Sequence, residues 1–312
     1  MAKLICGVDV SSEALDARIG RDGKSHQFER TLEGIQALGA FCKANGVTVV
    51  VMEATGGYER LPFGLLWQLG TPVAIVNPRS VRRFAEAMGF FEKTDKIDAG
   101  VIASYAEVKR VVPQEPLGVD HERLRALVTR LRQLTDLQTS QSNQRRLVVE
   151  PVVLSAFDEL TGLVRGQIKS LSAQITELID VDPLWAKLDE TFRTIKGVAD
   201  RTVAGIMADL PEIGTLSNKA IAKLVGAAPM AKDSGKTKGK RPIRGGRAGI
   251  RSLLYYVAGI VRKHEPDFKE FHERLLEAGK PPKVIRIALA RKLLVRLNAK
   301  ARDARKEFAL AT

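Results

Sequence analysis

The apolar residues in the first third of the chain gather in short runs separated by amphipathic stretches. KLICGVDV (3–10) is almost continuously hydrophobic, and VTVVVME (47–53) is strongly β-branched. Such runs are typical of strands buried on both faces of a sheet. Further strands are expected at 13–20, 25–31 and 72–78, and helices at 33–45, 58–69, 80–88 and 95–109. This order predicts a mixed sheet with helices on its faces.

After Pro116 the hydrophobic period becomes that of an amphipathic helix. Leucines recur at steps of three and four residues from Leu124 to Leu137, and a similar rhythm runs from Leu160 to Leu178. The two stretches predict long helices paired as a hairpin around Glu150-Pro151. Helices of this kind pack on each other or on a second subunit, so we expect a homo-oligomer, either a dimer or a tetramer.

Beyond the hairpin, the chain continues as shorter helical segments interrupted by one aperiodic stretch. That stretch, 232–247 (KDSGKTKGKRPIRGGR), is rich in glycine and basic residues. It predicts a basic loop that becomes ordered on nucleic acid. Helices are expected at 183–195, from Asp200, at 249–262 and at 283–308. The predicted division is an α/β domain (1–112), a helical coiled-coil linker (113–182) and a basic helical domain (183–312).

The distribution of charge points to a polyanionic partner. Lysine and arginine number 50 against 36 acidic residues, for a net charge of +14. From Lys232 to Thr312 there are 22 basic and 8 acidic residues, whereas the preceding residues balance. A one-sided excess confined to one region favours nucleic acid, bound in a salt-dependent way. The expected nucleic-acid contacts are Lys232, Lys236, Lys238, Lys240, Arg241, Arg244, Arg247 and Arg251.

Several classes of protein are disfavoured by what the sequence lacks. No apolar stretch approaches the roughly 20 residues of a membrane helix, and MAKLICGVDV has no signal-peptide pattern. Cys6 and Cys42 lie in apolar and helical runs, so we expect reduced core cysteines. Nucleotide-binding loops, dinucleotide fingerprints and zinc motifs are absent from the sequence. A cytoplasmic protein with no membrane partner is expected.

Four carboxylates are candidates for a metal site. Asp9 and Glu53 end the two hydrophobic strands, where an ionised group needs a positive partner. Asp95 and Asp98 are three residues apart on an expected helix, so they share a face. Converging carboxylates repel one another unless a cation such as Mg²⁺ or Mn²⁺ lies between them. Two such ions can activate an attacking oxygen and stabilise a leaving oxygen in phosphodiester chemistry.

Each of these acids also has a simpler interpretation as a surface charge, and Asp95 as a helix N-cap. Elsewhere, Tyr255 and Tyr256 lie in the apolar helical run LLYYVAGI, which favours core packing over a nucleophilic role. The turn at Gly197 can either offer amides to a phosphate or form a plain helical corner. The four acids taken together favour a metal site.

Several segments resemble a known family. GVDVSS, VVMEATGGYE, VNPRSVRRFAEAMG and KTDKIDA, in this order, closely resemble the N-terminal half of the insertion-sequence-110 transposases, the DEDD recombinases. TIKGV, AGIMADLPEI, LVGAAPM and DSGK, with the following Arg/Gly-rich stretch, resemble that family's C-terminal domain. Nearly the whole chain is covered. One departure is Ala199, where helix–hairpin–helix turns usually have a second glycine.

The resemblance implies an RNase H-like domain of the Holliday-junction-resolvase type, a coiled-coil segment and a mainly α-helical transposase domain. It also implies that Asp9, Glu53, Asp95 and Asp98 match the DEDD set and that Ser234 matches the nucleophilic serine. The family is understood to recombine donor and target DNA under the guidance of a structured RNA, as an oligomer with shared active sites. By itself, a serine in a Gly/Lys-rich loop is more often an ordinary loop residue.

Three functional hypotheses follow. The first is a transposase that joins DNA through a covalent link to Ser234, with Mg²⁺-bound carboxylates activating the hydroxyl. The second is a metal-dependent junction nuclease in which water attacks. The third is a non-enzymatic scaffold that binds nucleic acid. A covalent protein–DNA species separates the first two, and Mg²⁺-dependent cleavage separates both from the third.

Overall fold

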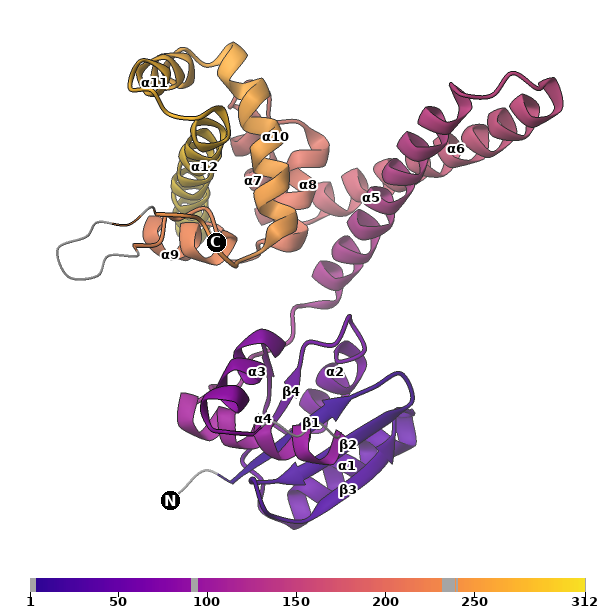
Figure 1. Ribbon diagram of the computed structural model, residues 1–312, viewed down its shortest axis with the longest axis vertical. Helices are drawn as coiled ribbons and strands as arrows, with labels where there is room; N and C mark the ends of the chain where they lie inside the picture. Colours follow the sequence, from indigo (N-terminus) through magenta and orange to yellow (C-terminus); the bar gives the residue numbers. More distant parts are fainter. Residues whose placement is uncertain (1–3, 91–94, 232–238, 240, 312) are drawn as a thin grey trace. The chain divides into compact units, whose positions relative to one another are not determined.

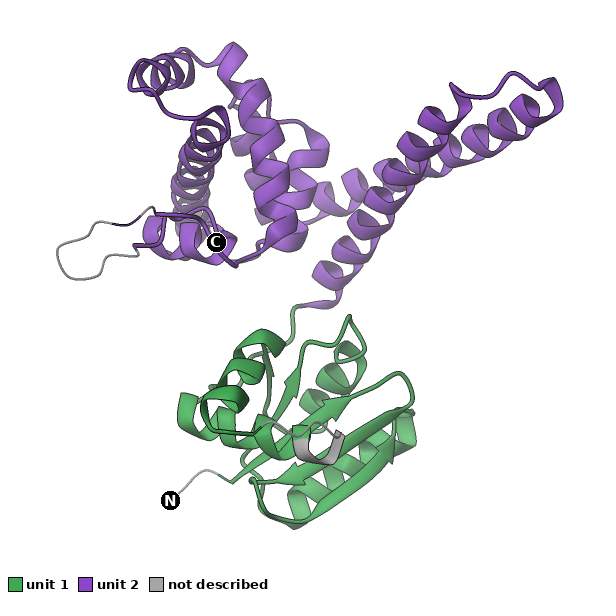
Figure 2. Ribbon diagram, in the orientation of Figure 1, with its two compact units in different colours: residues 1–117 green, residues 118–312 purple. Residues whose placement is uncertain are grey.

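The computed structural model describes residues 4–90, 95–231, 239 and 241–311; the side chains of 95–97 and 311 lie outside the description. The chain divides into two compact units, Met1–Leu117 and Gly118–Thr312, coloured separately in Figure 2. The first unit contains a sheet with helices on both faces, and the second contains helices (Figure 1). Each unit has its own hydrophobic core.

The first unit contains a five-stranded mixed sheet of order β3-β2-β1-β4-β5. β1 pairs antiparallel with β2 and parallel with β4; β3 continues the antiparallel side and β5 the parallel side. This arrangement confirms the predicted mixed sheet with helices on its faces. The strands are β1 (Ile5–Val10), β2 (Ala14–Ile19), β3 (Ser25–Glu29), β4 (Val49–Glu53) and β5 (Val73–Val76).

Helices cover both faces of this sheet. On one face, Cys6, Val8 and Met52 share a core with Ile35 and Leu38. These last two belong to α1 (Leu32–Ala44), which is followed along the chain by α2 (Arg60–Gln68). The other face of the sheet packs against α3 (Pro78–Ala87) and α4 (Asp95–Lys109). Because side chains alternate along a strand, neighbouring residues of β1 and β4 enter different cores.

The second unit begins with the predicted helical hairpin. α5 (Val119–Arg145) and α6 (Pro151–Val181) lie side by side (Figure 1), with Leu131, Leu134 and Ile168 in the core. At the end of the hairpin, Arg145 donates two hydrogen bonds to the carboxylate of Asp158, at 2.8 and 2.9 Å. These bonds tie the end of α5 to the first turns of α6.

Of the remaining helices, α7, α9, α10 and α11 pack against α12, while α8 packs against α5, α7 and α10; all of them share one core with the hairpin. The structure therefore joins the predicted coiled-coil linker and the predicted C-terminal domain in a single compact unit. The helix α11, which our sequence analysis did not identify, begins with Pro266 at its first turn. The helices are α7 (Pro183–Arg193), α8 (Asp200–Asp209), α9 (Asn218–Val225), α10 (Ala248–His264), α11 (Pro266–Glu277) and α12 (Pro282–Ala311).

In the part of the chain that the structure describes, no helix is both long enough and apolar enough to cross a membrane.

Candidate active site

Asp9 and Glu53 lie on adjacent parallel strands and point to the same face of the sheet. Val8 of β1 is the register partner of Met52 of β4, so Asp9 and Glu53 follow at neighbouring positions. Val8 and Met52 enter the core on the α1 side. Because alternate residues point to opposite faces, the two carboxylates point toward α3 and α4. Strand pairing therefore brings together acids that are 44 residues apart in the sequence.

A close approach of α4 to β1 brings Asp98 to the same place. A Cβ atom on Gly7 would lie 2.0 Å from the carbonyl oxygen of Ala99 and 2.6 Å from the backbone nitrogen of Ala103. Only glycine leaves room for the helix backbone at this distance. Gly7 and Asp9 are two residues apart and share a face. The helix that carries Asp98 is therefore placed directly beside the strand that carries Asp9.

These three carboxylates line one cavity of about 620 Å³. Asp9, Glu53 and Asp98 are each half-buried, and each already contacts other groups of the chain. Asp95 begins α4 one turn before Asp98, but its side chain lies outside the described part of the structure. Three of the four acids expected from the sequence therefore line a common space.

Helix α3 adds positive charge to the cavity, which our sequence analysis did not anticipate. Arg79, Arg82 and Arg83 belong to its lining, together with Glu86. The Nε of Arg82 lies 3.2 Å from the Oε1 of Glu86, and both side chains are about half exposed. Arginines beside carboxylates suit a site where a metal ion and a phosphate meet, because guanidinium groups pair with phosphate oxygens. The available signal was the RSVRR run in a segment that resembles the family.

The loop after β4 is held in shape by another residue that sequence analysis missed, Glu59. Its Oε2 accepts hydrogen bonds from the backbone nitrogens of Thr55 and Gly57, both at 2.9 Å. The Glu59 side chain is buried, at 8% exposure. Since Thr55 lines the cavity two residues after Glu53, these hydrogen bonds fix the backbone at the edge of the site.

Besides Glu59, Asp16 is a buried acid, and it lies opposite Asp9 across the β1–β2 pair. Its carboxylate is 5% exposed and accepts hydrogen bonds from the Nε2 of Gln27, at 3.1 and 3.3 Å. Leu15 and Ala17 enter the core on the α1 side, so strand alternation turns Asp16 toward the same face as Asp9. Asp16 is not part of the cavity lining, and the hydrogen bonds from Gln27 satisfy its buried carboxylate.

The donor chemistry of the cavity fits a hard divalent cation. Asp9, Glu53 and Asp98 supply carboxylate oxygens, the ligands that Mg²⁺ and Mn²⁺ prefer. Among the side chains that the structure describes, no three acids, histidines or cysteines form a group tight enough to enclose an ion.

Backbone pairing joins the two ends of the segment that carries Ser234. Pro229 and Ile243 form an antiparallel bridge, and the backbone nitrogen of Met230 donates to the carbonyl of Pro242 at 3.0 Å. The two ends of the segment therefore lie side by side. The expected nucleophile and four of the expected basic contacts lie outside the described residues: Ser234, Lys232, Lys236, Lys238 and Lys240.

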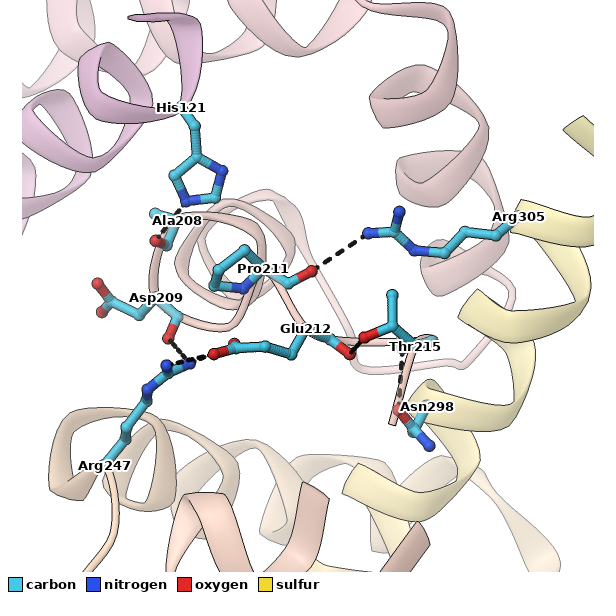
Figure 3. Close-up of polar contacts among 10 residues, drawn as sticks. His121, Ala208, Asp209, Pro211, Glu212, Thr215, Arg247, Asn298 and Arg305 are labelled. Atoms are coloured by element: carbon cyan, nitrogen blue, oxygen red, sulfur yellow. Dashed lines mark hydrogen bonds and ion pairs between the residues drawn. The ribbon is translucent and has the colours of Figure 1, made fainter. Parts of the chain in front are cut away.

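The structure gives Arg247 and Arg251, two of the expected nucleic-acid contacts, partners within the chain. Arg247 makes a bidentate pair with Glu212 at 2.6 Å and also donates to the carbonyl of Asp209, as Figure 3 shows. Arg251 donates to the carbonyls of Val225 and Gly245. Both side chains therefore brace the turns that flank α9 and α10. Arg241 and Arg244 are exposed.

The carboxyl of Glu212 is affected by two opposing influences. Burial by itself raises the pKa of Glu212, but the hydrogen bond and charge of Arg247 outweigh this effect, so the pKa lies below its ordinary value. The pair therefore stabilises the folded protein where Glu212 is ionised. On its other side, the same turn is held by Arg305, which donates to the carbonyl of Pro211 (Figure 3).

The turn at Gly197 makes a hydrogen bond within the chain. The backbone nitrogen of Lys196 donates to the Oε1 of Glu265 at 3.1 Å, so this turn already uses an amide within the chain, as a helical corner does.

Tyr255 is half-buried beside Arg286, but Tyr256 is 71% exposed. The prediction of core packing is wrong for Tyr256, because the buried stripe of α10 passes through Leu254, Val257 and Val261 instead.

Comparison with known proteins identifies the family. A model described as "Transposase", of the DEDD IS110 type, matches residues 6–152, and one described as "Transposase IS116/IS110/IS902 family" matches 189–273. Pilin gene-inverting proteins of Moraxella bovis and Moraxella lacunata are each 28% identical over 307 residues, covering 94% of this chain and 94% of the relative. Among solved structures, the Thermus thermophilus RuvC structure matches at 13% identity with a TM-score of 0.27, covering 36% of this chain and 99% of that one.

Both units are thus matched by models of the same family, and the full-length relatives cover nearly the whole chain. The family that the sequence motifs resemble is therefore confirmed. The chain belongs to the IS110 family of transposases, and it is an enzyme that recombines DNA.

Proposed function

We propose that this transposase cuts and rejoins DNA through a phosphoserine link formed by Ser234, with Asp9, Glu53, Asp95 and Asp98 holding Mg²⁺. The observation that supports the proposal is the cavity of the first unit, where three of these carboxylates face three arginines. Such a cavity can hold a divalent cation and a DNA phosphate together. A structural role would explain a buried acid such as Asp16 better than half-buried acids that line a cavity.

The reaction consists of two balanced transfers. In the first, the Oγ of Ser234 attacks a DNA phosphorus; the bond from phosphorus to a deoxyribose oxygen breaks, and this oxygen takes up a proton while the serine gives one up. In the second, a hydroxyl of another DNA end attacks the phosphorus and gives up its proton; the bond from phosphorus to the serine Oγ breaks, and the serine takes up a proton. When bound, Mg²⁺ supplies Lewis-acid stabilisation of the charge that develops on the phosphate. The arginines of α3 orient the phosphate oxygens.

We base the proposed partners on the basic segment around Ser234 and on the helical hairpin of α5 and α6. Arg241 and Arg244 are exposed beside the Ser234 segment and can contact donor and target DNA. A structured RNA from the same element would select sequence by base pairing, and the protein would read shape and backbone. A homo-oligomer, dimer or tetramer, would bring Ser234 of one subunit to the carboxylates of the same or another subunit.

The names of the two relatives suggest which DNA arrangements to test. Both are described as inverting a pilin gene. Strand exchange between two sites on one DNA molecule can invert the segment between them, whereas exchange between two molecules joins them. Substrates should therefore include two sites on one molecule as well as separate donor and target DNA.

A trapping assay tests the proposal. The protein is purified with the RNA that it carries and is mixed with labelled donor and target DNA and Mg²⁺; the products are then separated on a denaturing gel. A labelled band at the mass of the protein is expected, and it should vanish in Ser234→Ala and in Asp9→Ala.

The same assay separates the alternatives. Free cut DNA without a covalent band, still produced by Ser234→Ala, would replace the proposal by a nuclease that uses water. Tight, salt-sensitive binding without cleavage, in the presence of the element's RNA, would favour a scaffold. Strand exchange at the normal rate by Ser234→Ala would exclude the serine mechanism altogether.

A further inference from the structure

An apolar groove in the second unit lies beside the backbone bridge between Pro229 and Ile243, which joins the two ends of the Ser234 segment. It is formed by one face of α12, by α11 and by the two chain segments that meet at Pro229 and Ile243. Its volume is about 700 Å³, within the range of pockets that bind small molecules. Figure 1 shows α12 running past α11 and α9 in this unit.

Helix α12 has two apolar stripes where one would be enough for packing. Ile285, Leu289 and Leu293 are almost fully buried and form the core stripe. A second stripe, through Val284, Ile287, Ala288 and Val295, faces the groove, and Val284 is 52% exposed. An amphipathic helix that only packs on its core shows one such stripe. The apolar lining of the groove is completed by Pro229, Ile243 and Phe271.

The charged residues of the lining that the structure describes are all positive. They are Arg241, Lys283, Arg291 and Lys292, and no acid is among these described lining residues. Lys292 is already paired with Asp267, at 2.9 Å. Arg291 is half-buried, and neither it nor Lys283 makes an ion pair with any residue that the structure describes. A half-buried guanidinium that has no acidic partner among the described residues favours an anionic ligand.

We propose that this groove binds one unpaired nucleotide of the nucleic acid, with the base on the apolar stripe of α12 and Phe271, and the phosphate at Arg291 and Lys283. A flat apolar base attached to an anionic phosphate matches both the floor and the rim of the groove. A purely apolar peptide would leave the arginine without a partner, and duplex DNA presents no free base to fill the floor. The inference rests on the proposed action on DNA, because it assigns a binding site within that function.

The groove can be tested by binding, without cleavage. Full-length protein, with the RNA it carries, is titrated in EDTA with a short single-stranded DNA and with an abasic strand of the same length. The strands share their phosphates and differ only in their bases. Because stacking of one base contributes substantially to binding, the wild type should bind the normal strand about 10-fold more tightly than the abasic strand.

Two variants test separately the apolar residues proposed to hold the base and the basic residues proposed to hold the phosphate. Ala288→Leu fills the floor without changing charge, and it should remove the preference for bases while leaving abasic binding unchanged. Arg291→Gln should weaken binding of both strands by about 10-fold. The matched controls lie on the exposed end of the same helix, Ala309→Leu for volume and Lys306→Gln for charge, and should behave as the wild type.

Photocrosslinking provides a readout that does not depend on affinity. A strand that carries 4-thiothymine should crosslink to the 284–295 peptide or to Phe271, and Ala288→Leu should abolish this crosslink. An unchanged base preference in Ala288→Leu would overturn the proposal. A change in oligomeric state without a change in base preference would instead assign the groove to a second copy of the chain. Because the assay needs neither metal nor Ser234, its outcome is independent of the trapping assay.

Discussion

The cavity of the first unit and the basic segment of the second unit use arginine in different ways. In the cavity, Arg79 and Arg83 lie on exposed turns of α3, beside carboxylates that line the same space. In the second unit, Arg247 and Arg251 are bound to a glutamate and to backbone carbonyls. Net charge therefore indicates the class of partner, but not which basic residues touch it. Only the internal partners of each arginine decide whether it supports the fold or is available to a phosphate.

The largest expected effect is on the carboxylates of the cavity. Asp9→Asn should lower strand transfer by about 1000-fold, because it removes a charged ligand where the phosphate charge develops. Thermal unfolding in the absence of metal should change little. Asp22→Asn, in the exposed turn after β2, is the matched control. Strand transfer at the wild-type rate in Asp9→Asn would remove the cavity from the mechanism.

The contact between α4 and β1 gives the next largest effect. Gly7→Ala places a Cβ atom against the backbone of Ala99 and Ala103, which forces the helix away from the strand. The free energy of unfolding should fall by about 1–3 kcal/mol, and activity should fall further because Asp98 moves with α4. Gly162→Ala is the control: a Cβ there meets nothing within 4 Å in α6, and it should stabilise the helix by up to about 1 kcal/mol. Denaturant unfolding compares the two; equal effects would contradict the close packing.

The arginines of the second unit can be sorted by paired measurements. Arg247→Gln breaks the pair with Glu212 and should reduce the free energy of unfolding by about 1–3 kcal/mol. Arg244→Gln should leave unfolding unchanged and reduce the salt dependence of DNA binding by about one unit of slope. If Arg244→Gln alters stability while Arg247→Gln alters only binding, the assignment of internal and external arginines is reversed.

Arg83 offers the corresponding test in the first unit. Arg83→Gln should weaken DNA binding by a few-fold and lower the salt slope by about one, without a change in stability. Lys109→Gln, at the exposed end of α4, is the control for loss of a single charge. Binding measured at several salt concentrations distinguishes the two. Equal effects would mean that the cavity has no special role in holding phosphate.

The smallest effect concerns pH. The pKa of Glu212 is lowered in the folded protein, so its pair with Arg247 stabilises the fold fully above the ordinary glutamate pKa of about 4.3. The contribution is lost as the pH falls through the lower, folded value. The difference in unfolding free energy between the wild type and Arg247→Gln should therefore shrink on acidification from neutral pH to below about 4. A difference that is constant with pH would show that the pair contributes through packing alone.

Hydrophobic pattern was enough to predict the sheet and the helical hairpin. β1 and β4 were visible as apolar runs, and α5 and α6 as leucine repeats, because strand and helix periods are local properties of the chain. Helix α11 was missed because its twelve residues bury only Phe268 deeply. Tyr256 was misplaced because an apolar run around a helix does not show which side faces the core.

The site was predictable only in part. Asp9, Glu53, Asp95 and Asp98 stand out in the sequence because acids rarely follow buried strands or sit together in a resembling motif. The RSVRR run marks the segment of Arg83 as basic, but whether Arg83 and Glu59 contribute to the cavity depends on where α3 and the loop after β4 fold, which the run itself does not show. The assignment of metal ligands and of Ser234 stays a prediction until the trapping assay is done.

By itself, the sequence determined the alternation of strands and helices, the positions of the acids at strand ends, the concentration of positive charge near the C-terminus and the family. These depend on residue type and spacing along one dimension. Tertiary structure alone decided that Gly7 lets α4 meet β1, that Arg247 pairs with Glu212, and that α12 turns a second apolar stripe toward a basic-rimmed groove. Each of these depends on distances between residues far apart in the chain, and such distances are fixed only when the backbone packs.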